Sequence, residues 1–323
     1  MKAKTIDLAT LVKKIKKAKT FLIATHENPD GDGIGSIIAL GEGLKSLGKK
    51  VTLYIKDPVP KMYQYLPGHK NIKTTLPAKT KFDLSFLVDL GELERVGQDF
   101  INCAGRNETI SLDHHANGAH NADFNFCLPK EASSGEVIYK ILKALKVKFN
   151  KTIATGIYTA MVTDTGSFKY SNTNAHTFAV AADLMQFKID VWQVAFNCFE
   201  SSSRERMEYL KRALASLTVH PSGKIASIAL KQNDLTETGA KSDEAEGFIN
   251  YPRSIEGVEV ALSFKEIAAN SYKISFRSKD YVDVGAIANS FGGGGHTRAS
   301  GCKAKGTLTE VQSQIINAVL AKL

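Results

Sequence analysis

The chain has 323 residues, of which 43% are hydrophobic and 23% charged, and its formal net charge at pH 7 is +9. This length suits two domains with separate cores, and no segment reaches the ~18 uninterrupted apolar residues that a membrane-spanning helix needs. None of the four cysteines stands in C-x-x-C spacing, so we expect a reduced cytoplasmic protein without disulfides, thiolate zinc or membrane contact. The positive charge favours anionic partners such as phosphates or short nucleic acids.

The first half of the chain alternates short apolar runs with helical patterns. Its first helix is amphipathic, with Leu8, Leu11, Val12 and Ile15 at helical spacing, and does not resemble a signal peptide. The expected strands are Phe21–Ala24, Val51–Ile55, Leu84–Val88 and Thr109–Leu112. The expected helices are Ile34–Leu47, Ser134–Leu145, Thr152–Val162 and His176–Phe187. This alternation predicts a parallel sheet with helices on both faces, and ligands bind such sheets at the carboxyl ends of the strands.

The second half has a different pattern. The segment Asp190–Leu217 is predicted to be a helical connector. After it we expect strands at Ile225–Leu230, Val258–Phe264 and Tyr272–Phe276. The last two should form a hairpin around Ala269-Asn270. Helices are expected at Asp283–Ser290 and Thr309–Leu323. The predicted fold class is α/β, with a parallel-sheet domain over 1–189, a helical linker over 190–217 and a smaller α+β domain over 218–323.

One turn between a predicted strand and a predicted helix holds His26, Asp30 and Asp32. Carboxylates crowded in this way repel one another unless a cation holds them. A plain turn is one alternative, because Pro29-Asp30-Gly31 is a good turn sequence. A dinucleotide-binding loop is another, but Ser36 stands where its third glycine is required. The pattern therefore favours metal binding.

More acidic and histidine residues follow later apolar segments. Asp89 follows the predicted strand Leu84–Val88, Asp113-His114-His115 follows Thr109–Leu112, and Asp164 follows a helical pattern. Each of these alone could be a helix cap or a turn residue. Together with the first turn they are enough for two metal ions that share a ligand. Oxygen-rich ligands with one histidine per metal favour two divalent ions, Mn²⁺ first, with Mg²⁺ or Co²⁺ as alternatives.

A run of four glycines, 292–295, precedes His296. Such a backbone can approach an anion and direct several N–H groups at it, and His296, Arg298 and Ser300 add donors. Arg277 and Lys279, at the end of the preceding strand, could reach the same pocket. The alternative is a flexible turn between a helix and a strand. The flanking histidine and arginine favour anion binding.

Taken together, these motifs resemble the DHH phosphoesterase superfamily. The closest resemblance is to the branch with a DHH-associated C-terminal domain, which includes oligoribonuclease/pAp phosphatase enzymes of the NrnA type. The resemblance covers nearly the whole chain, through the segments His26–Ser36, Asp89, Asp113–His115, Ala132–Glu136, Asp164–Phe168, Glu246–Pro252 and Phe291–Gly301. One departure is Ala299-Ser300-Gly301, where many members have Ala-Ala-Gly.

The resemblance implies a role for each motif residue. One metal would be held by His26, Asp30 and Asp89. The other would be held by Asp32, Asp89, His114 and Asp164. The catalytic residues would be Asp89 as the shared ligand, Asp113 orienting the neighbouring imidazole, and His115 facing the scissile phosphate. Across a cleft between the domains, the nucleotide end of the substrate would be held by Arg277, Gly293, Gly294, Gly295, His296, Arg298 and Ser300.

The implied activity is manganese-dependent hydrolysis of short RNA oligonucleotides to mononucleotides, of pAp to AMP, or of both. A phosphodiesterase for linear or cyclic dinucleotides such as pApA is the alternative within this class. A RecJ-like exonuclease and an inorganic pyrophosphatase fit less well, and a non-catalytic nucleotide-binding module is the alternative from another class. A homodimer is compatible with the sequence.

Overall fold

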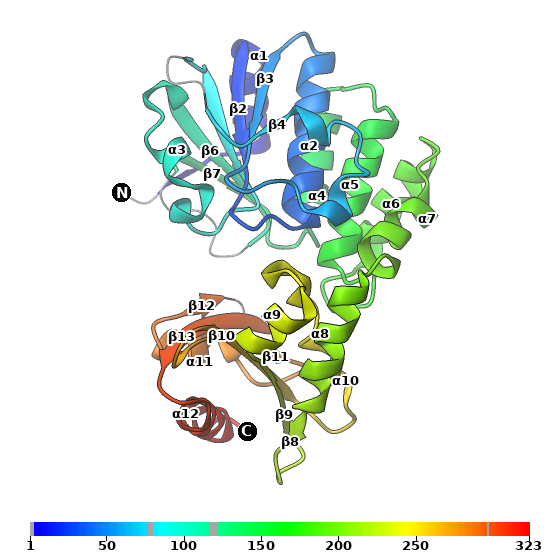
Figure 1. Ribbon diagram of the computed structural model, residues 1–323. Helices are drawn as coiled ribbons and strands as arrows, with labels where there is room; N and C mark the ends of the chain where they lie inside the picture. The colour runs from blue at the N-terminus through cyan, green and yellow to red at the C-terminus, as the bar shows by residue number, and fades with distance from the viewer. Residues whose placement is uncertain (1–2, 77–79, 116–121, 296) are drawn as a thin grey trace. The chain divides into compact units, whose positions relative to one another are not determined.

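The computed structural model describes residues 3–76, 80–115, 122–295 and 297–323. Contacts between residues divide the chain into two compact units, Met1–Ser201 and Ser202–Leu323 (Figure 1). The boundary falls inside the segment that we expected to link the domains, and the bounds 1–189, 190–217 and 218–323 stay a prediction. Among the described residues, no helix is both long and apolar enough to cross a lipid bilayer.

The first unit contains a seven-stranded sheet in the order β1-β7-β6-β5-β2-β3-β4. Every neighbouring pair in this order is parallel. The strands are β1 Lys4–Thr5, β2 Thr20–Ala24, β3 Lys50–Tyr54, β4 Ile72–Lys73, β5 Leu84–Val88, β6 Glu108–Asp113 and β7 Phe124–Cys127. The predicted parallel sheet is confirmed. The strands β1 and β4 were not anticipated because each has two residues, and β7 was not because the polar Asn125 interrupts its apolar run.

Helices cover both faces of this sheet. They are α1 Leu8–Lys17, α2 Gly31–Ser46, α3 Gln98–Ile101, α4 Ser134–Ala144, α5 Lys151–Asp164, α6 Ala175–Met185 and α7 Val191–Ala195. Side chains of β2 alternate between two cores: Phe21 and Ile23 pack with α2, α4 and α5, whereas Leu22 packs with Phe100 of α3. Figure 1 shows α3 on the opposite side of the sheet from α2, α4 and α5. Short 3-10 segments lie at Lys61–Tyr63, His69–Asn71, Leu93–Val96 and Ala104–Arg106.

The segment 190–217 is not one helix. The helix α7 continues into a π-helical turn at Phe196–Glu200, and α8 begins at Arg204. The hydroxyl of Ser203 caps α8 by accepting from the N–H of Arg206. Serine favours such caps and weakens helix interiors, which explains why the chain breaks here.

The second unit contains a mixed six-stranded sheet in the order β12-β13-β11-β10-β9-β8. Its strands are β8 Thr218–Val219, β9 Ile225–Leu230, β10 Val260–Ala268, β11 Ser271–Ser278, β12 Gly294–Gly295 and β13 Ala299–Lys305. Only the pair β9–β10 is parallel. The expected hairpin is β10–β11, which turns at Asn270 with a φ of 52°. The expected strand at Ile225–Leu230 is confirmed.

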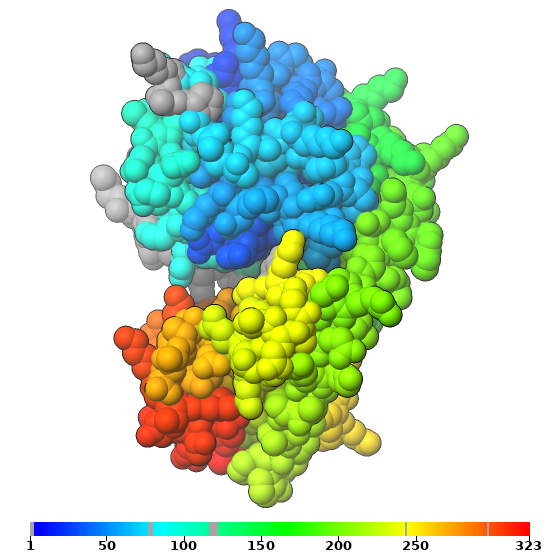
Figure 2. Space-filling view, in the orientation of Figure 1, coloured from blue at the N-terminus to red at the C-terminus, as the bar shows by residue number. Residues whose placement is uncertain are grey.

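Helices flank this second sheet as well. They are α8 Arg204–Ala215, α9 Gln232–Thr238, α10 Asn250–Ser254, α11 Val284–Ser290 and α12 Leu308–Leu320, with a 3-10 turn at Ser242–Ala245. Tyr209 of α8 packs with Ile228 of β9, whereas Ile287 of α11 and Ile315 of α12 pack with Phe276 of β11 in a separate core. Figure 2 shows α12, coloured red, at the surface of this unit.

Two glycines bring α2 and α5 into close contact. A Cβ atom at Gly35 would lie 2.2 Å from the carbonyl oxygen of Gly156, and one at Gly156 would lie 2.7 Å from that of Gly35. We therefore expect Gly35→Ala to lower the free energy of unfolding by about 1–3 kcal/mol, because the helices must separate. Urea denaturation measures this. Gly91→Ala, where nothing lies within 4 Å of the added Cβ, is the control, and equal stability of the two variants would refute this packing argument.

Candidate metal centre

Three adjacent strands, β6, β5 and β2, end at one edge of the first sheet. The chain places His26 just after β2, Asp89 just after β5, and Asp113 at the end of β6. Asp89 adopts a left-handed φ of 56°, and its N–H donates to the carbonyl oxygen of Leu112 at 3.1 Å. Aspartate tolerates this conformation better than most residues. The predicted convergence of these side chains at the carboxyl ends of parallel strands is what the structure shows.

The aspartates of the first motif lie at the beginning of α2. Asp30 is the N-cap, and its carboxylate accepts from the N–H of Gly33 at 3.0 Å. Asp32 is buried in the first turn and accepts from the N–H groups of Ser134 and Gly135, at 2.7 and 2.9 Å. Its carboxyl group therefore lies between the amino ends of α2 and α4, where helix dipoles favour the ionised form.

The possible ligand atoms form three groups, and Asp89 and His114 each belong to two of them. The atoms of each group lie within 4.8 Å of one another, and the groups are His26/Asp30/Asp89, Asp32/His114/Asp164 and Asp89/Asp113/His114/His115. His26 Nε2 lies 3.6 Å from Asp89 Oδ2, and His114 Nε2 lies 3.7 Å from Asp32 Oδ2 and from Asp164 Oδ2. These distances are too long for hydrogen bonds, but atoms so spaced can bind one ion at ~2.0–2.2 Å each.

The two histidines that face the carboxylates have the orientation of metal ligands. His114 Nε2 is buried without a hydrogen-bond partner, while its Nδ1 lies 3.3 Å from the carbonyl oxygen of Glu131. His26 Nδ1 lies 2.8 Å from the carbonyl oxygen of Glu27. A proton on Nδ1 of His114 leaves its Nε2 lone pair directed at the carboxylates, as in metal-binding histidines. His26 Nδ1 also lies 3.1 Å from Arg95 Nη2, which can only donate, and its Nε2 faces Asp30 and Asp89. The residues present thus fit divalent metal ions.

The other histidine of the motif has a different environment. His115 Nδ1 contacts Asp113 Oδ1 at 2.6 Å, and this oxygen also accepts from the N–H groups of His114 and His115. Asp113 is fully buried. The imidazole that Asp113 orients is therefore that of His115.

The charges in this centre perturb one another strongly. Burial and the charges of Asp89 and Asp164 raise the pKa of Asp32 well above its usual value. Burial opposes ionisation of Asp89, but the surrounding histidines outweigh it and hold its pKa below the usual range. Burial also opposes the charge on His26, yet Asp30 and Asp89 raise its pKa to about 10. The carboxylates therefore attract positive charge, which protons supply where metal ions do not.

The pKa values of His114 and His115 are shifted in opposite directions. Burial and the charge of His115 lower the pKa of His114, which favours the neutral form that binds metal. For His115, burial lowers the pKa, but Asp113 and Asp89 outweigh it and raise the pKa to about 9. At neutral pH His115 is thus a cation that can pair with an anion.

The residues that hold the ligands in place were not among the sequence candidates. Ser134 Oγ contacts Asp89 Oδ1 at 3.2 Å, in addition to the bonds from α4 to Asp32. Asn172 Nδ2 lies 2.9 Å from the carbonyl oxygen of Ala132 and 3.2 Å from Asp164 Oδ2. The Ser-Ser-Gly start of α4 is a helix N-terminus signal that could have indicated the first of these supports.

We expect Asn172→Ala to lower metal affinity or activity about 10- to 100-fold, because Asp164 loses the amide that orients it. Metal titration and steady-state kinetics of the purified variant measure this. Asn102→Ala, a change at the exposed C-cap residue of α3, serves as the control. Wild-type metal affinity and wild-type kcat/KM in Asn172→Ala would show that Asp164 needs no such support.

A fourth ligand group, Glu131/Glu136/His176, lies beside the centre. Glu131 already contacts Lys140 Nζ and His176 Nε2, both at 3.2 Å. Burial raises the pKa of Glu136. Because Glu131 is already engaged in these ion pairs, we assign no metal to the group.

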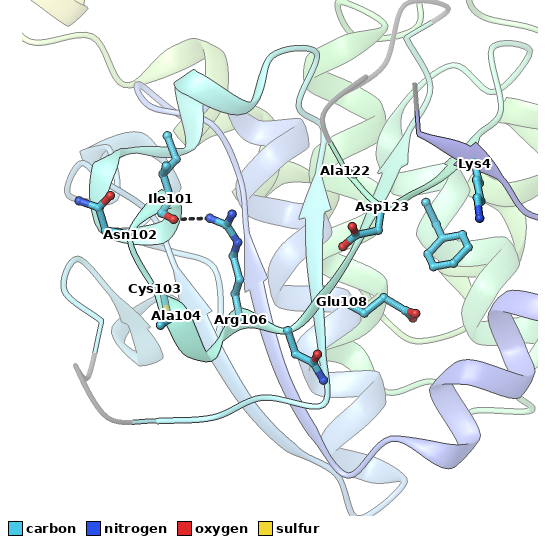
Figure 3. A pocket seen from close by; sticks show the side chains of 11 residues that line it. Lys4, Ile101, Asn102, Cys103, Ala104, Arg106, Glu108, Ala122 and Asp123 are labelled. Atoms are coloured by element: carbon cyan, nitrogen blue, oxygen red, sulfur yellow. Dashed lines mark hydrogen bonds between the residues drawn. The ribbon is translucent and has the colours of Figure 1, made fainter. Parts of the chain in front are cut away.

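The cavity in Figure 3, of about 910 Å³, lies at the opposite end of the strands. It is lined by residues at the beginnings of β6 and β7, such as Glu108 and Phe124, whereas Asp113 stands at the end of β6. The guanidinium of Arg106 donates to the carbonyl oxygens of Phe100 and Ile101, and Glu108 pairs with Lys14. The charges of Arg106 and Glu108 are thus engaged structurally, and the cavity is separate from the metal centre.

In the second unit, the structure brings together most of the predicted substrate-binding residues. Gly294 and Gly295 pair with Gly301 and Ser300 across β12–β13, and Arg277 stands opposite Ala299 across β11–β13. Gly293 and Arg298 flank the same strands, Ser300 lies within β13, and His296 lies outside the described residues. The roles of these residues in substrate binding, and the cleft between the domains, stay predictions.

Part of this glycine loop has a structural explanation. A Cβ atom at Gly293 would lie 2.2 Å from the carbonyl oxygen of Gly301, and Gly295 has a φ of 137°. Ser300 is buried, and its hydroxyl donates to the carbonyl oxygen of Val284 at 2.6 Å. Close approach of β12 to β13 therefore requires glycine here whether or not an anion binds.

Comparisons with known proteins agree with this geometry. The model of the DHH family, N-terminal domain, matches residues 20–161, and that of the DHHA1 domain matches residues 223–323. The bifunctional oligoribonuclease and PAP phosphatase NrnA of Thermus thermophilus is 28% identical over 303 residues, which cover 93% of this chain and 89% of that protein.

Solved structures share the fold. An exopolyphosphatase-related protein from Bacteroides fragilis has a TM-score of 0.87 and 25% identity, covering 97% of this chain and 95% of that one. RecJ from Thermus thermophilus, in complex with Mn²⁺, has a TM-score of 0.50 and 14% identity, covering 97% of this chain and 53% of that one. The likeness to RecJ concerns the fold alone.

Proposed function

Because the chain belongs to the DHH family and carries a DHHA1 domain, we propose that it is a two-metal phosphoesterase acting on short RNA oligonucleotides, on pAp, or on both. The observation that carries the proposal is the position of Asp89. Its carboxylate belongs to the His26/Asp30 group and to the His114/His115 group at once. A carboxylate shared in this way suits two ions held side by side.

One ion would be held by His26, Asp30 and Asp89. The other would be held by Asp32, Asp89, His114 and Asp164. The donors are carboxylate oxygens and imidazole nitrogens without a thiolate, a set that favours Mn²⁺ and admits Mg²⁺ or Co²⁺. When bound, such ions activate water as a nucleophile and neutralise charge on the phosphoryl oxygens.

The protein residues around the ions would position the substrate. His115 is partly exposed, and Asp113 holds it in one orientation through the 2.6 Å contact. A protonated imidazole there can donate to a phosphoryl oxygen or to the leaving group. The relatives named as NrnA act on oligoribonucleotides and PAP, which supports the same substrate class for this chain.

A substrate panel tests this function. We would measure hydrolysis of pAp, pApA, RNA of two to five nucleotides, long single-stranded DNA and pyrophosphate, each with Mn²⁺ and with EDTA. The proposal predicts hydrolysis of short RNA, pAp or both with Mn²⁺ and none with EDTA. Hydrolysis of pApA alone would indicate a dinucleotide phosphodiesterase. No metal-dependent hydrolysis of any phosphoester would contradict the proposal and favour a nucleotide-binding module.

A further inference from the structure

A buried carboxylate fixes one loop of the second unit. Glu259, just before β10, is 4% exposed. Its Oε1 accepts from the N–H groups of Asp280, Tyr281 and Val282 at 3.1, 2.9 and 3.0 Å. A buried carboxylate is costly unless hydrogen bonds satisfy it, and three consecutive N–H groups do so here. The loop Lys279–Asp283, which we call the 279–283 loop, is thereby held in one backbone conformation.

The 279–283 loop lies against the segment that follows the glycines. The guanidinium of Arg298 donates through Nη1 to the carbonyl oxygen of Val282 at 3.0 Å. On either side of the loop, the N–H of Ser278 donates to the carbonyl oxygen of Arg298, and that of Val284 to the carbonyl oxygen of Thr297. The loop and Arg298 therefore form one hydrogen-bonded structure.

Tyr281 stands at the centre of this loop, and its side chain is 53% exposed. The bonds to Glu259 fix its backbone N–H, and the next residue, Val282, contacts Arg298. An exposed aromatic ring on a fixed loop whose backbone also binds an arginine is suited to single-stranded nucleic acids. The ring offers a flat face on which a base stacks, and the cation attracts the backbone phosphate.

We propose that Tyr281 is a stacking surface for a nucleobase of the substrate, and that Glu259 is the positioning residue that holds it. This inference rests on the proposed function, in which Arg298 and its neighbours bind the nucleotide end of the substrate. Stacking is tolerant of base identity because every base has a π-face. The site therefore recognises a nucleoside as such, not one sequence.

The test compares two substrates of equal charge with wild-type enzyme and Mn²⁺: pApA, and an analogue in which abasic residues replace both nucleosides. Tyr281→Ala should raise KM for pApA roughly 5- to 150-fold, the range expected for a lost base stack, and leave KM for the abasic analogue within about twofold. Tyr281→Phe should restore wild-type KM. Glu259→Ala, which removes the oxygen that accepts from the loop N–H groups, should raise KM for pApA in the same selective way, with kcat little changed.

The control is Ile267→Ala. Ile267 is 41% exposed and lies at the other end of the β10–β11 hairpin, so its loss should leave both KM values unchanged. If Tyr281→Ala changed KM equally for both substrates, or for neither, the stacking inference would be wrong. Hydrolysis by the wild-type enzyme would still support the proposed function. Wild-type enzyme that hydrolyses neither these nor any other phosphoester would instead show that the proposed function fails.

Discussion

Replacing Asp89 with asparagine should lower kcat/KM about a thousandfold or more at saturating Mn²⁺. The change keeps the shape of the side chain but removes the charge that two ligand groups share. Metal ions contribute several kcal/mol to transition-state stabilisation, and each ~1.4 kcal/mol corresponds to a tenfold change in rate. Steady-state kinetics with the best substrate of the panel give the measurement.

The matched control is Asp183→Asn. Asp183 is a carboxylate of the same unit that pairs with Lys143 at 2.9 Å, away from the centre. Because Asp183 belongs to none of the ligand groups, activity should stay within about twofold. An Asp89→Asn enzyme with the activity of this control would show that no shared metal ligand is needed at Asp89.

Adding Mn²⁺ to metal-free protein should raise its midpoint of thermal unfolding by about 5–10 °C. The buried carboxylates of the centre repel one another, and ions bound only by the folded state stabilise it by about 2.7 kcal/mol at 100 times Kd. In a domain of this size, each kcal/mol shifts the midpoint by about 2–4 °C. Asp89→Asn should show a smaller shift, and an unchanged wild-type midpoint would contradict a preformed metal site.

The affinity of the centre for metal ions should change with pH in one direction. The pKa of His26 is raised to about 10, so His26 is protonated at pH 7 in metal-free protein and must lose that proton to bind metal. Metal affinity should therefore rise with pH below about 10. The raised pKa also stabilises metal-free protein fully below about pH 6.5, and this stability is lost as the pH rises through about 10. Calorimetric titration in buffers of different ionisation enthalpy counts the released protons.

The sequence predicts those ligands of the metal centre that come directly after an apolar strand. His26, Asp89 and Asp113 each come directly after a run of buried residues, and parallel strands bring such ends together. The sequence could indicate a helix N-terminus at Ser134, but not which ligand it supports, because that depends on tertiary contacts. Ser134 reaches Asp32 across 102 positions of the chain, and no local pattern encodes that distance.

The strands β12 and β13 of the second unit were also hard to predict from the sequence, because they too depend on tertiary contacts. The strand β13 runs through Ala-Ser-Gly-Cys-Lys-Ala-Lys, which lacks the apolar alternation of a typical half-buried strand. Its partner β12 consists of two glycines. These strands exist because the backbone of β13 pairs with β11 and that of β12 pairs with β13, and only the structure shows that Ser300 and the glycines serve this pairing.

A crystal structure of the wild-type protein grown with Mn²⁺, with anomalous diffraction to locate the ions, tests the central claim most directly. The account predicts two ions in the first unit. Asp89 should contact both, His26 and Asp30 only one, and Asp32, His114 and Asp164 only the other. A single ion in this centre, or two ions that do not share Asp89, would contradict it.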